Sequence, residues 1–184
     1  MGDIGVIEQM RRSLPRGWSA FKIAVDGDCI RDVLCQTENL PTHATHLIVS
    51  VGGNDLIGYS HLLSSVRSLN DAGSVLAAPK ATFAALYGEM LDQLQQLPVQ
   101  LGVCTVYTAI PFEEPLLRSF GAFAIGQFNE LICEQAAVRN VPVFRLDQVC
   151  TESDDFSAVS PIEPSSKGGQ KIVDGLIAFL SDAA

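Results

Sequence analysis

Residues 45–55 read THLIVSVGGND, an apolar run followed by a short polar stretch that begins with two glycines. The run over 45–51 has the length and composition of a buried strand. In open α/β sheets, ligands bind beyond the carboxyl ends of the strands, where glycines let the backbone approach a substrate and a side-chain amide can donate to an oxyanion. We therefore expect four residues to line a substrate site: Gly52, Gly53, Asn54 and Asp55.

The segments around this strand alternate between helical and strand-like patterns. Apolar spacing predicts helices over 4–14, 29–40, 81–97, 118–139 and 169–180, and strands over 20–25, 45–51, 101–110 and 141–146. Two stretches are predicted to be irregular, 56–80 and 150–167. Strands separated by helices of this length pair in parallel through right-handed crossovers, so we expect a doubly wound α/β sheet that is covered on both faces.

The length and composition favour a single globular domain over residues 1–184. The chain is 47% hydrophobic and 18% charged, so it can bury one sizeable core but is short for two domains. Its 12 Lys and Arg against 21 Asp and Glu give a formal net charge of −9, and the basic residues do not cluster beyond Arg11 and Arg12. Nucleic acid is therefore not an expected partner, since binding it requires a concentrated positive surface.

The sequence shows neither a membrane span nor a targeting segment. No run approaches the roughly 18 apolar residues of a span, and the N-terminus lacks a basic segment followed by an apolar one. The 5 cysteines are odd in number and have no C-x-x-C spacing, which argues against disulfides and a metal site and favours buried thiols in a reducing compartment. We therefore expect a soluble, cytoplasmic protein that uses no metal and no cofactor.

Three blocks of the sequence carry a resemblance to a known family. Residues 51–55, VGGND, are similar to the Gly-x-Asn-Asp block of the SGNH (GDSL) hydrolases. Residues 24–27, AVDG, and 160–169, SPIEPSSKGG, are similar to the second and last blocks of that family. The chain thus resembles these serine esterases and lipases over essentially its whole length. The resemblance implies a flavodoxin-like sheet and a small-molecule ester as the ligand.

The resemblance also implies functions for three residues. Gly27 stands at the glycine whose backbone N–H helps bind the oxyanion, and Asn54 stands at the asparagine whose side chain is a further donor. Glu163 stands where the family has its catalytic histidine, which makes it the candidate base. Because loops that follow parallel strands converge at one edge of the sheet, we expect Gly27, Asn54 and Glu163 to surround one cleft.

The catalytic triad of the family is altered in this chain. Family members begin with a strand that ends in Gly-Asp-Ser, whose serine is the nucleophile, whereas this chain opens with Met1-Gly2-Asp3-Ile4. Either Gly2 and Asp3 are a remnant with Ile4 in place of the serine, or the whole block is absent. Ser160 stands where the family has an aspartate. We therefore expect the first strand of the sheet and the nucleophile to be missing.

These features leave two functions open and disfavour a third. The first is metal-free hydrolysis of an acyl ester, impaired by loss of the nucleophile; a carboxylate with a pKa of about 4.3 is also a poorer proton acceptor than an imidazole at about 6.5. The second is a pseudoenzyme that binds an ester, a carbohydrate or a protein partner without cleaving it. A nucleotide-binding flavodoxin-like module fits poorly, because no Gly-rich phosphate loop follows a first strand.

Overall fold

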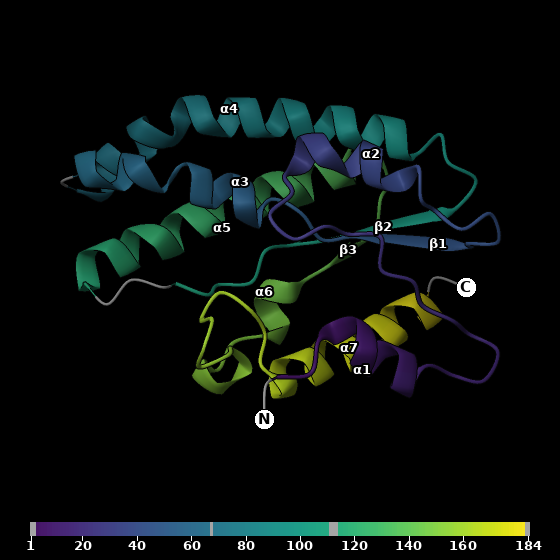
Figure 1. Ribbon diagram of the computed structural model, residues 1–184. Helices are drawn as coiled ribbons and strands as arrows, with labels where there is room; N and C mark the ends of the chain where they lie inside the picture. Colours follow the sequence, from purple (N-terminus) through teal and green to yellow (C-terminus); the bar gives the residue numbers. More distant parts are fainter. Residues whose placement is uncertain (1–2, 67, 111–113, 183–184) are drawn as a thin grey trace. The chain divides into compact units, whose positions relative to one another are not determined.

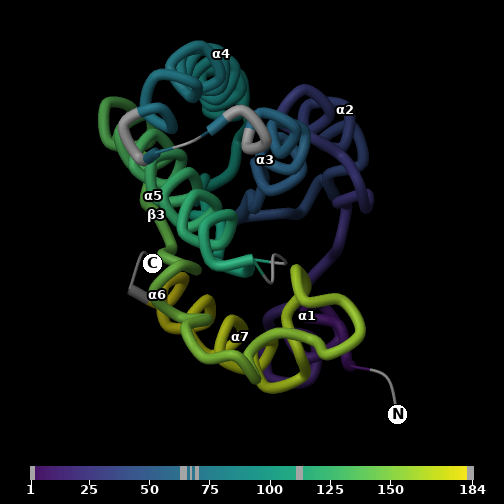
Figure 2. The backbone as a smooth tube through the Cα atoms, turned by 90° about the vertical axis from the view of Figure 1, so that its left-hand side faces the viewer, coloured from purple at the N-terminus to yellow at the C-terminus, as the bar shows by residue number. Residues whose placement is uncertain are grey.

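The computed structural model describes residues 3–66, 68–110 and 114–182 of a mixed α/β chain (Figures 1 and 2). The strands are β1 (His46–Val49), β2 (Gln100–Cys104) and β3 (Val143–Phe144). The α-helices are α1 (Val6–Ser13), α2 (Val33–Thr37), α3 (Gly53–Gly58), α4 (Leu69–Leu94), α5 (Pro115–Ala137), α6 (Leu146–Val149) and α7 (Ser166–Asp182). Short 3-10 helices are η1 (Ile30–Asp32), η2 (Ser60–Ser65) and η3 (Ser153–Asp155). None of the described helices is both long enough and apolar enough to cross a membrane.

The described residues form two compact units. Unit 1 contains residues 3–22, 107–110 and 144–182. Unit 2 contains residues 23–66, 68–106 and 114–143. The single domain expected over residues 1–184 therefore stays a prediction.

Parallel strand pairing builds the sheet. β1 pairs in parallel with β2, with His46 opposite Gln100 and Val49 opposite Val103. The strand order is β1-β2-β3, so β1 lies at an edge of the described sheet. A hairpin cannot join parallel neighbours, and the connection from β1 to β2 accordingly runs through α3 and the long helix α4. The parallel α/β sheet predicted from the sequence is confirmed.

Apolar side chains from the strands and from two long helices form the core of unit 2. The helices α4 and α5 pack side by side (Figures 1 and 2). The rings of Phe83 and Tyr87 on α4 stack with centroids 5.5 Å apart, and Phe83 meets Phe128 on α5 edge to face at 4.9 Å. Leu47 and Val49, alternate residues of β1, are buried in the same cluster. Offset and edge-to-face aromatic pairs add stability to the burial of apolar surface.

The helices α1 and α7 pack against each other in unit 1 (Figure 2). The N-terminal segment also holds the first residue of α7. Ser166 N–H donates to Asp3 Oδ1 at 2.9 Å, and Ile4 N–H donates to Ser166 Oγ at 2.9 Å. A carboxylate is favourable there because the first N–H groups of a helix have no helical partner and carry partial positive charge. Asp3 therefore caps a helix that begins 163 residues later in the chain.

The prediction of an irregular stretch over 56–80 is wrong. The helix α4 begins at Leu69 and continues through Pro79. A proline inside a helix removes one hydrogen bond and costs about 3 kcal/mol. Leu76 and Phe83, on either side of the proline, are 4% and 1% exposed. We infer that this tertiary burial offsets the local cost of the proline. The prediction from local sequence ended the irregular stretch near Pro79 because it could not include that burial.

Several predicted elements are shorter than expected or absent. The described structure has no strand over 20–25, because a strand needs a hydrogen-bonded neighbour and no strand pairs with these residues there. The helix predicted over 29–40 is reduced to η1 and α2, and the strands over 101–110 and 141–146 are reduced to β2 and β3. The other predicted helices, 4–14, 81–97, 118–139 and 169–180, correspond to α1, α4, α5 and α7.

A buried asparagine on α5 holds the chain where it leaves β2. Asn129 is 4% exposed. Its Nδ2 donates to Val106 O at 2.7 Å, and its Oδ1 accepts from Val106 N–H at 2.8 Å. One side chain thereby satisfies both backbone polar groups of a residue just beyond the strand, as a neighbouring strand would otherwise do.

We expect Asn129→Ala to lower the free energy of unfolding by about 2 kcal/mol or more, because it leaves two backbone groups unpaired at about 1–3 kcal/mol each. Urea denaturation followed by circular dichroism measures this change. The matched control is Glu130→Ala at the next, exposed position, where we expect a change within about 0.5 kcal/mol. Equal losses of unfolding free energy in the two variants would show that the hydrogen bonds of Asn129 to Val106 do not stabilise the fold.

Candidate functional site

The turn after β1 has a backbone conformation that requires glycine. Gly52 is buried and has φ = +114°, in the left-handed region. A Cβ added there would lie 3.1 Å from Cζ of Phe83, so a larger residue would be both strained and crowded. Leu56 N–H donates to Gly52 O at 3.0 Å, which starts α3 immediately after the turn. The turn therefore ends the strand and places the next side chains at its carboxyl end.

Asn54 connects this turn to a second glycine turn. It is exposed in the first turn of α3, and its Nδ2 donates to Asp28 O at 2.9 Å. Asp28 follows Gly27, which has φ = +91° in the turn closed by Asp28 N–H and Val25 O. The structure thus brings the segments of Gly27 and Asn54 together within unit 2. An amide nitrogen carries two hydrogens, so one donor of Asn54 is engaged by Asp28.

Asp55 makes a second connection between the same two segments. Its Oδ2 accepts from Ile30 N–H at 3.2 Å. Burial raises the pKa of Asp55, and the nearby charge of Asp32 raises it further, while hydrogen bonds from backbone N–H groups partly oppose the rise. Asp55 therefore holds the backbone of the segment that follows Gly27. Its expected place in the lining of a substrate site stays a prediction.

Cys29 lies beside these acidic residues, whose charges act on its thiol. Burial raises the pKa of its thiol, and the charges of Asp55, Asp32 and Asp28 raise it further. The thiolate is the reactive form of cysteine, and negative neighbours disfavour it. Burial and the acidic neighbours therefore both favour the thiol of Cys29 over the reactive thiolate.

Glu163 belongs to unit 1, whereas Gly27 and Asn54 belong to unit 2. The backbone of Glu163 is held on both sides: its N–H donates to Ser160 O at 2.9 Å, and its C=O accepts from Ser157 N–H at 2.8 Å. Its side chain is exposed. The single cleft expected from the sequence for Gly27, Asn54 and Glu163 stays a prediction.

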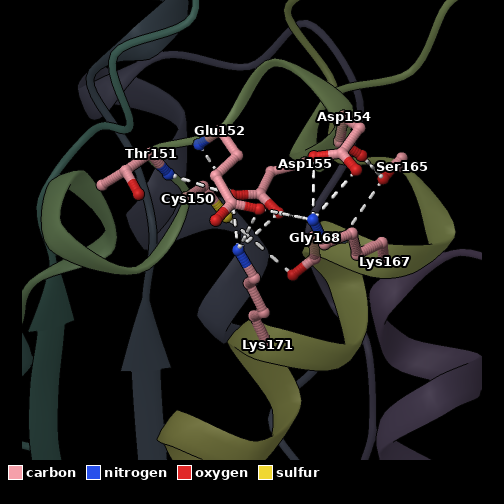
Figure 3. Close-up of polar contacts among 9 residues, drawn as sticks. All are labelled: Cys150, Thr151, Glu152, Asp154, Asp155, Ser165, Lys167, Gly168 and Lys171. Carbon is pink, nitrogen blue, oxygen red and sulfur yellow. Dashed lines mark hydrogen bonds and ion pairs between the residues drawn. The ribbon is translucent and has the colours of Figure 1, made fainter.

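Unit 1 also contains a cluster of carboxylates that sequence reasoning missed (Figure 3). One oxygen each from Glu152, Asp154 and Asp155 lie within 4.8 Å of one another, a spacing that could suit a cation. Two lysines of α7 already neutralise the cluster, Lys167 through Glu152 and Asp154 Oδ1 (2.8 Å), and Lys171 through Asp155 Oδ1 (2.8 Å). A metal ion would have to displace both ammonium groups, so the cluster is better described as an ion-pair network.

Asp155 is the centre of that network. It is fully buried, and its Oδ2 accepts from the N–H groups of Thr151 at 3.0 Å and Glu152 at 2.9 Å. Burial alone would raise its pKa, but the hydrogen bond and charge of Lys171 together with the backbone donors hold the pKa below the usual value. The sequence signal was present as three acidic residues within positions 152–155 and two lysines, Lys167 and Lys171, spaced four residues apart.

The comparisons with known proteins agree with this architecture. No family profile and no curated protein sequence matches the chain. Among solved structures, it is similar to an extracellular lipase from Streptomyces rimosus, with a TM-score of 0.71, 15% identity, and coverage of 98% of this chain and 86% of that one. It is also similar to the acetyl xylan esterase AlAXEase, with a TM-score of 0.67, 15% identity, and coverage of 96% and 90%.

A third similar structure belongs to a protein that is described by the Gly-Asp-Ser-Leu motif. It is a putative lipolytic protein of the G-D-S-L family from Desulfitobacterium hafniense, with a TM-score of 0.64, 13% identity, and coverage of 95% of this chain and 87% of that one. At these identities the likeness concerns the fold. The chain has the α/β fold of the SGNH/GDSL lipases and acetyl xylan esterases, and the fold implied by the sequence resemblance is confirmed.

We expect Gly52→Ala to lower the free energy of unfolding by about 1–3 kcal/mol, because alanine is strained at a positive φ and crowds Phe83. Gly53→Ala is the matched control, since its added Cβ would lie 3.8 Å from Val106 Cγ1, an ordinary contact. Thermal or urea denaturation of both variants checks the difference. If Gly52→Ala and Gly53→Ala lower the free energy of unfolding equally little, the turn tolerates a side chain at position 52.

The ion-pair network predicts a pH dependence of stability. The pKa values of Glu152, Asp154 and Asp155 are lowered in the folded state, so their contribution is present above their unfolded pKa values of about 4 and is lost as the pH falls through the folded ones. We expect Asp155→Asn to destabilise the chain at pH 7, and its difference from the wild type in free energy of unfolding to narrow as the pH falls below about 4.

Denaturant melts at several pH values measure that gap. The control is Asp174→Asn, an exposed change on α7, the helix that carries Lys167 and Lys171, which we expect to keep the pH dependence of the wild type. A gap for Asp155→Asn that stays constant down to pH 2 would count against the network.

Proposed function

We propose that this chain is an SGNH/GDSL-type hydrolase domain that binds an acyl ester, with the carbonyl oxygen held by the backbone N–H of Gly27 and the side-chain amide of Asn54. The observation that supports this most is the meeting of the two glycine turns: Asn54, at the carboxyl end of β1, is bonded to the residue after Gly27. Ligands of parallel α/β sheets bind at that end.

The chemistry of the two donors suits a carbonyl oxygen that becomes negative. Attack on an ester turns the carbonyl oxygen into an oxyanion, which preorganised N–H groups stabilise. Asn54 is exposed and has a second amide hydrogen beyond the one given to Asp28 O. The existing bond orients the amide plane, so the remaining N–H is presented in a defined direction.

We assign Glu163 as the general base and expect slow turnover of the ester. The tripeptide Gly-Asp-Ser occurs nowhere in the 184 residues. A carboxylate with an ordinary pKa of about 4.3 is also a weak base at neutral pH. Donors for the oxyanion nevertheless retain part of the binding and catalysis when a triad is lost.

The alternative proposal is a pseudoenzyme that binds an ester, a carbohydrate or a protein partner without cleaving it. One observation favours it: the amide of Asn54 already donates to Asp28 O, so part of the proposed oxyanion donor serves the protein's own structure. Ester binding without turnover would support this alternative over hydrolysis.

We expect the purified chain to hydrolyse p-nitrophenyl acetate at or near the buffer rate, and to resist fluorophosphonate labelling. Binding is tested with p-nitroacetanilide, an uncleaved amide analogue, by following the Asn54 side-chain NH₂ signal and the Gly27 backbone N–H signal in an ¹⁵N spectrum. We expect Asn54→Ala to abolish the ligand-induced shift of the Gly27 signal and Asn39→Ala, at an exposed position, to leave it unchanged. An unperturbed Asn54 signal at saturating analogue would refute the oxyanion assignment.

Extending the chain upstream by a strand that ends in Gly-Asp-Ser tests the catalytic half. We expect such a chain to gain esterase activity and a higher melting temperature, and Asn54→Ala in it to lower kcat by about 10²-fold or more, the scale for one oxyanion donor. Stoichiometric labelling of a serine in the unextended chain would instead reveal a surrogate nucleophile and contradict the proposal of slow turnover.

A further inference from the structure

Glu163 lies in a short loop of unit 1 that is closed by a backbone bridge at one end and has an exposed tip at the other. Phe156 and Pro164 form an isolated antiparallel bridge that closes the loop. Between them, Val159 is 93% exposed. A loop whose tip is so exposed is not held in place by packing there. The contacts near the closing bridge must therefore set the conformation of the loop.

Tyr107 supplies one of those contacts from a distant part of the chain. Its hydroxyl donates to the carbonyl oxygen of Ile162, the residue before Glu163, at 2.8 Å. Its ring lies against the ring of Phe156 with centroids 5.6 Å apart. Tyr107 thus contacts the loop both at the closing bridge and directly beside the candidate base.

The backbone around Glu163 is consequently bonded at three successive points. Tyr107 Oη bonds the carbonyl of Ile162, Ser160 O accepts from the Glu163 N–H, and Ser157 N–H bonds the Glu163 carbonyl. The carboxylate itself has no hydrogen bond or ion pair among the described residues and is exposed. A group that acts on a ligand needs a fixed support, and the bonded backbone of Glu163 meets that requirement.

We propose that Tyr107 is a positioning residue that holds the backbone of Glu163 in place through its hydroxyl. The inference rests on the proposed function for what Glu163 then does, and it adds a residue that the sequence motifs did not indicate. Burial raises the pKa of Tyr107 to about 12, with smaller contributions from the charges of Cys150 and Glu163. The hydroxyl of Tyr107 therefore remains a donor at neutral pH.

The substitution that isolates this contact is Tyr107→Phe, which keeps the ring against Phe156 and removes only the hydroxyl. Tyr87→Phe is the matched control: the Tyr87 hydroxyl is buried and has no hydrogen-bond partner among the described residues. We expect amide hydrogen exchange of Glu163 and Ser157 to accelerate by about tenfold or more in Tyr107→Phe, corresponding to about 1.4 kcal/mol of local stability. In Tyr87→Phe their exchange should not change. Unchanged exchange in Tyr107→Phe would overturn the proposal.

A kinetic cycle separates positioning from general stabilisation. In the Gly-Asp-Ser-extended chain, we expect Tyr107→Phe to lower kcat for p-nitrophenyl acetate by about tenfold with little change in KM. In a Glu163→Gln background the same substitution should have no further effect, because the group it positions is gone. Equal kcat losses in both backgrounds would show a structural residue only and overturn the proposal. Accelerated exchange without any hydrolysis would refute the catalytic assignment of Glu163 while retaining the contact to Tyr107.

Discussion

Parallel pairing of β1 with β2 is the constraint on which the rest of unit 2 depends. Two parallel neighbours cannot be connected by a tight turn, so the chain must return over a long crossover, here supplied mainly by the helix α4. That crossover carries the aromatic core, in which Phe83 and Tyr87 belong to the same buried cluster as apolar side chains of the strands. The turn that bears Asn54 begins the same crossover, directly after β1. The core and the candidate site therefore both lie on the connection that parallel pairing requires.

The candidate site depends on backbone conformations that few residues can adopt. Gly52 ends β1 in a left-handed conformation under the ring of Phe83, and Gly27 adopts a similar φ in the turn opposite. Asn54 and Asp55 then connect the two turns through one hydrogen bond each, to Asp28 O and from Ile30 N–H. Because these bonds are made by the protein itself, the side-chain amide of Asn54 is oriented before any ligand arrives, as the proposed oxyanion role requires.

Unit 1 is organised differently, around buried charge. Asp155 is fully buried, and two backbone N–H groups and Lys171 compensate its charge. A buried carboxylate is favourable only when such partners surround it, so the network specifies how the segment before α7 folds. That segment continues into the loop that carries Glu163, where Tyr107 bonds the backbone. Charge pairing and one tyrosine hydroxyl thus hold this loop in place, whereas apolar packing holds the sheet.

The sequence by itself determined the β1 strand, the glycine turn with Asn54 after it, most of the helices and the α/β class, because these follow from apolar periodicity and residue type over short windows. It did not determine that α4 continues through Pro79, that no strand pairs with residues 20–25, or that Asp155 is buried beside Lys171. Each of these depends on residues distant in the chain: core packing overrides a local helix breaker, a strand exists only beside a partner, and a carboxylate is buried only where distant donors meet it. The tertiary structure alone decided them, since the energy of each lies in contacts that no local pattern contains.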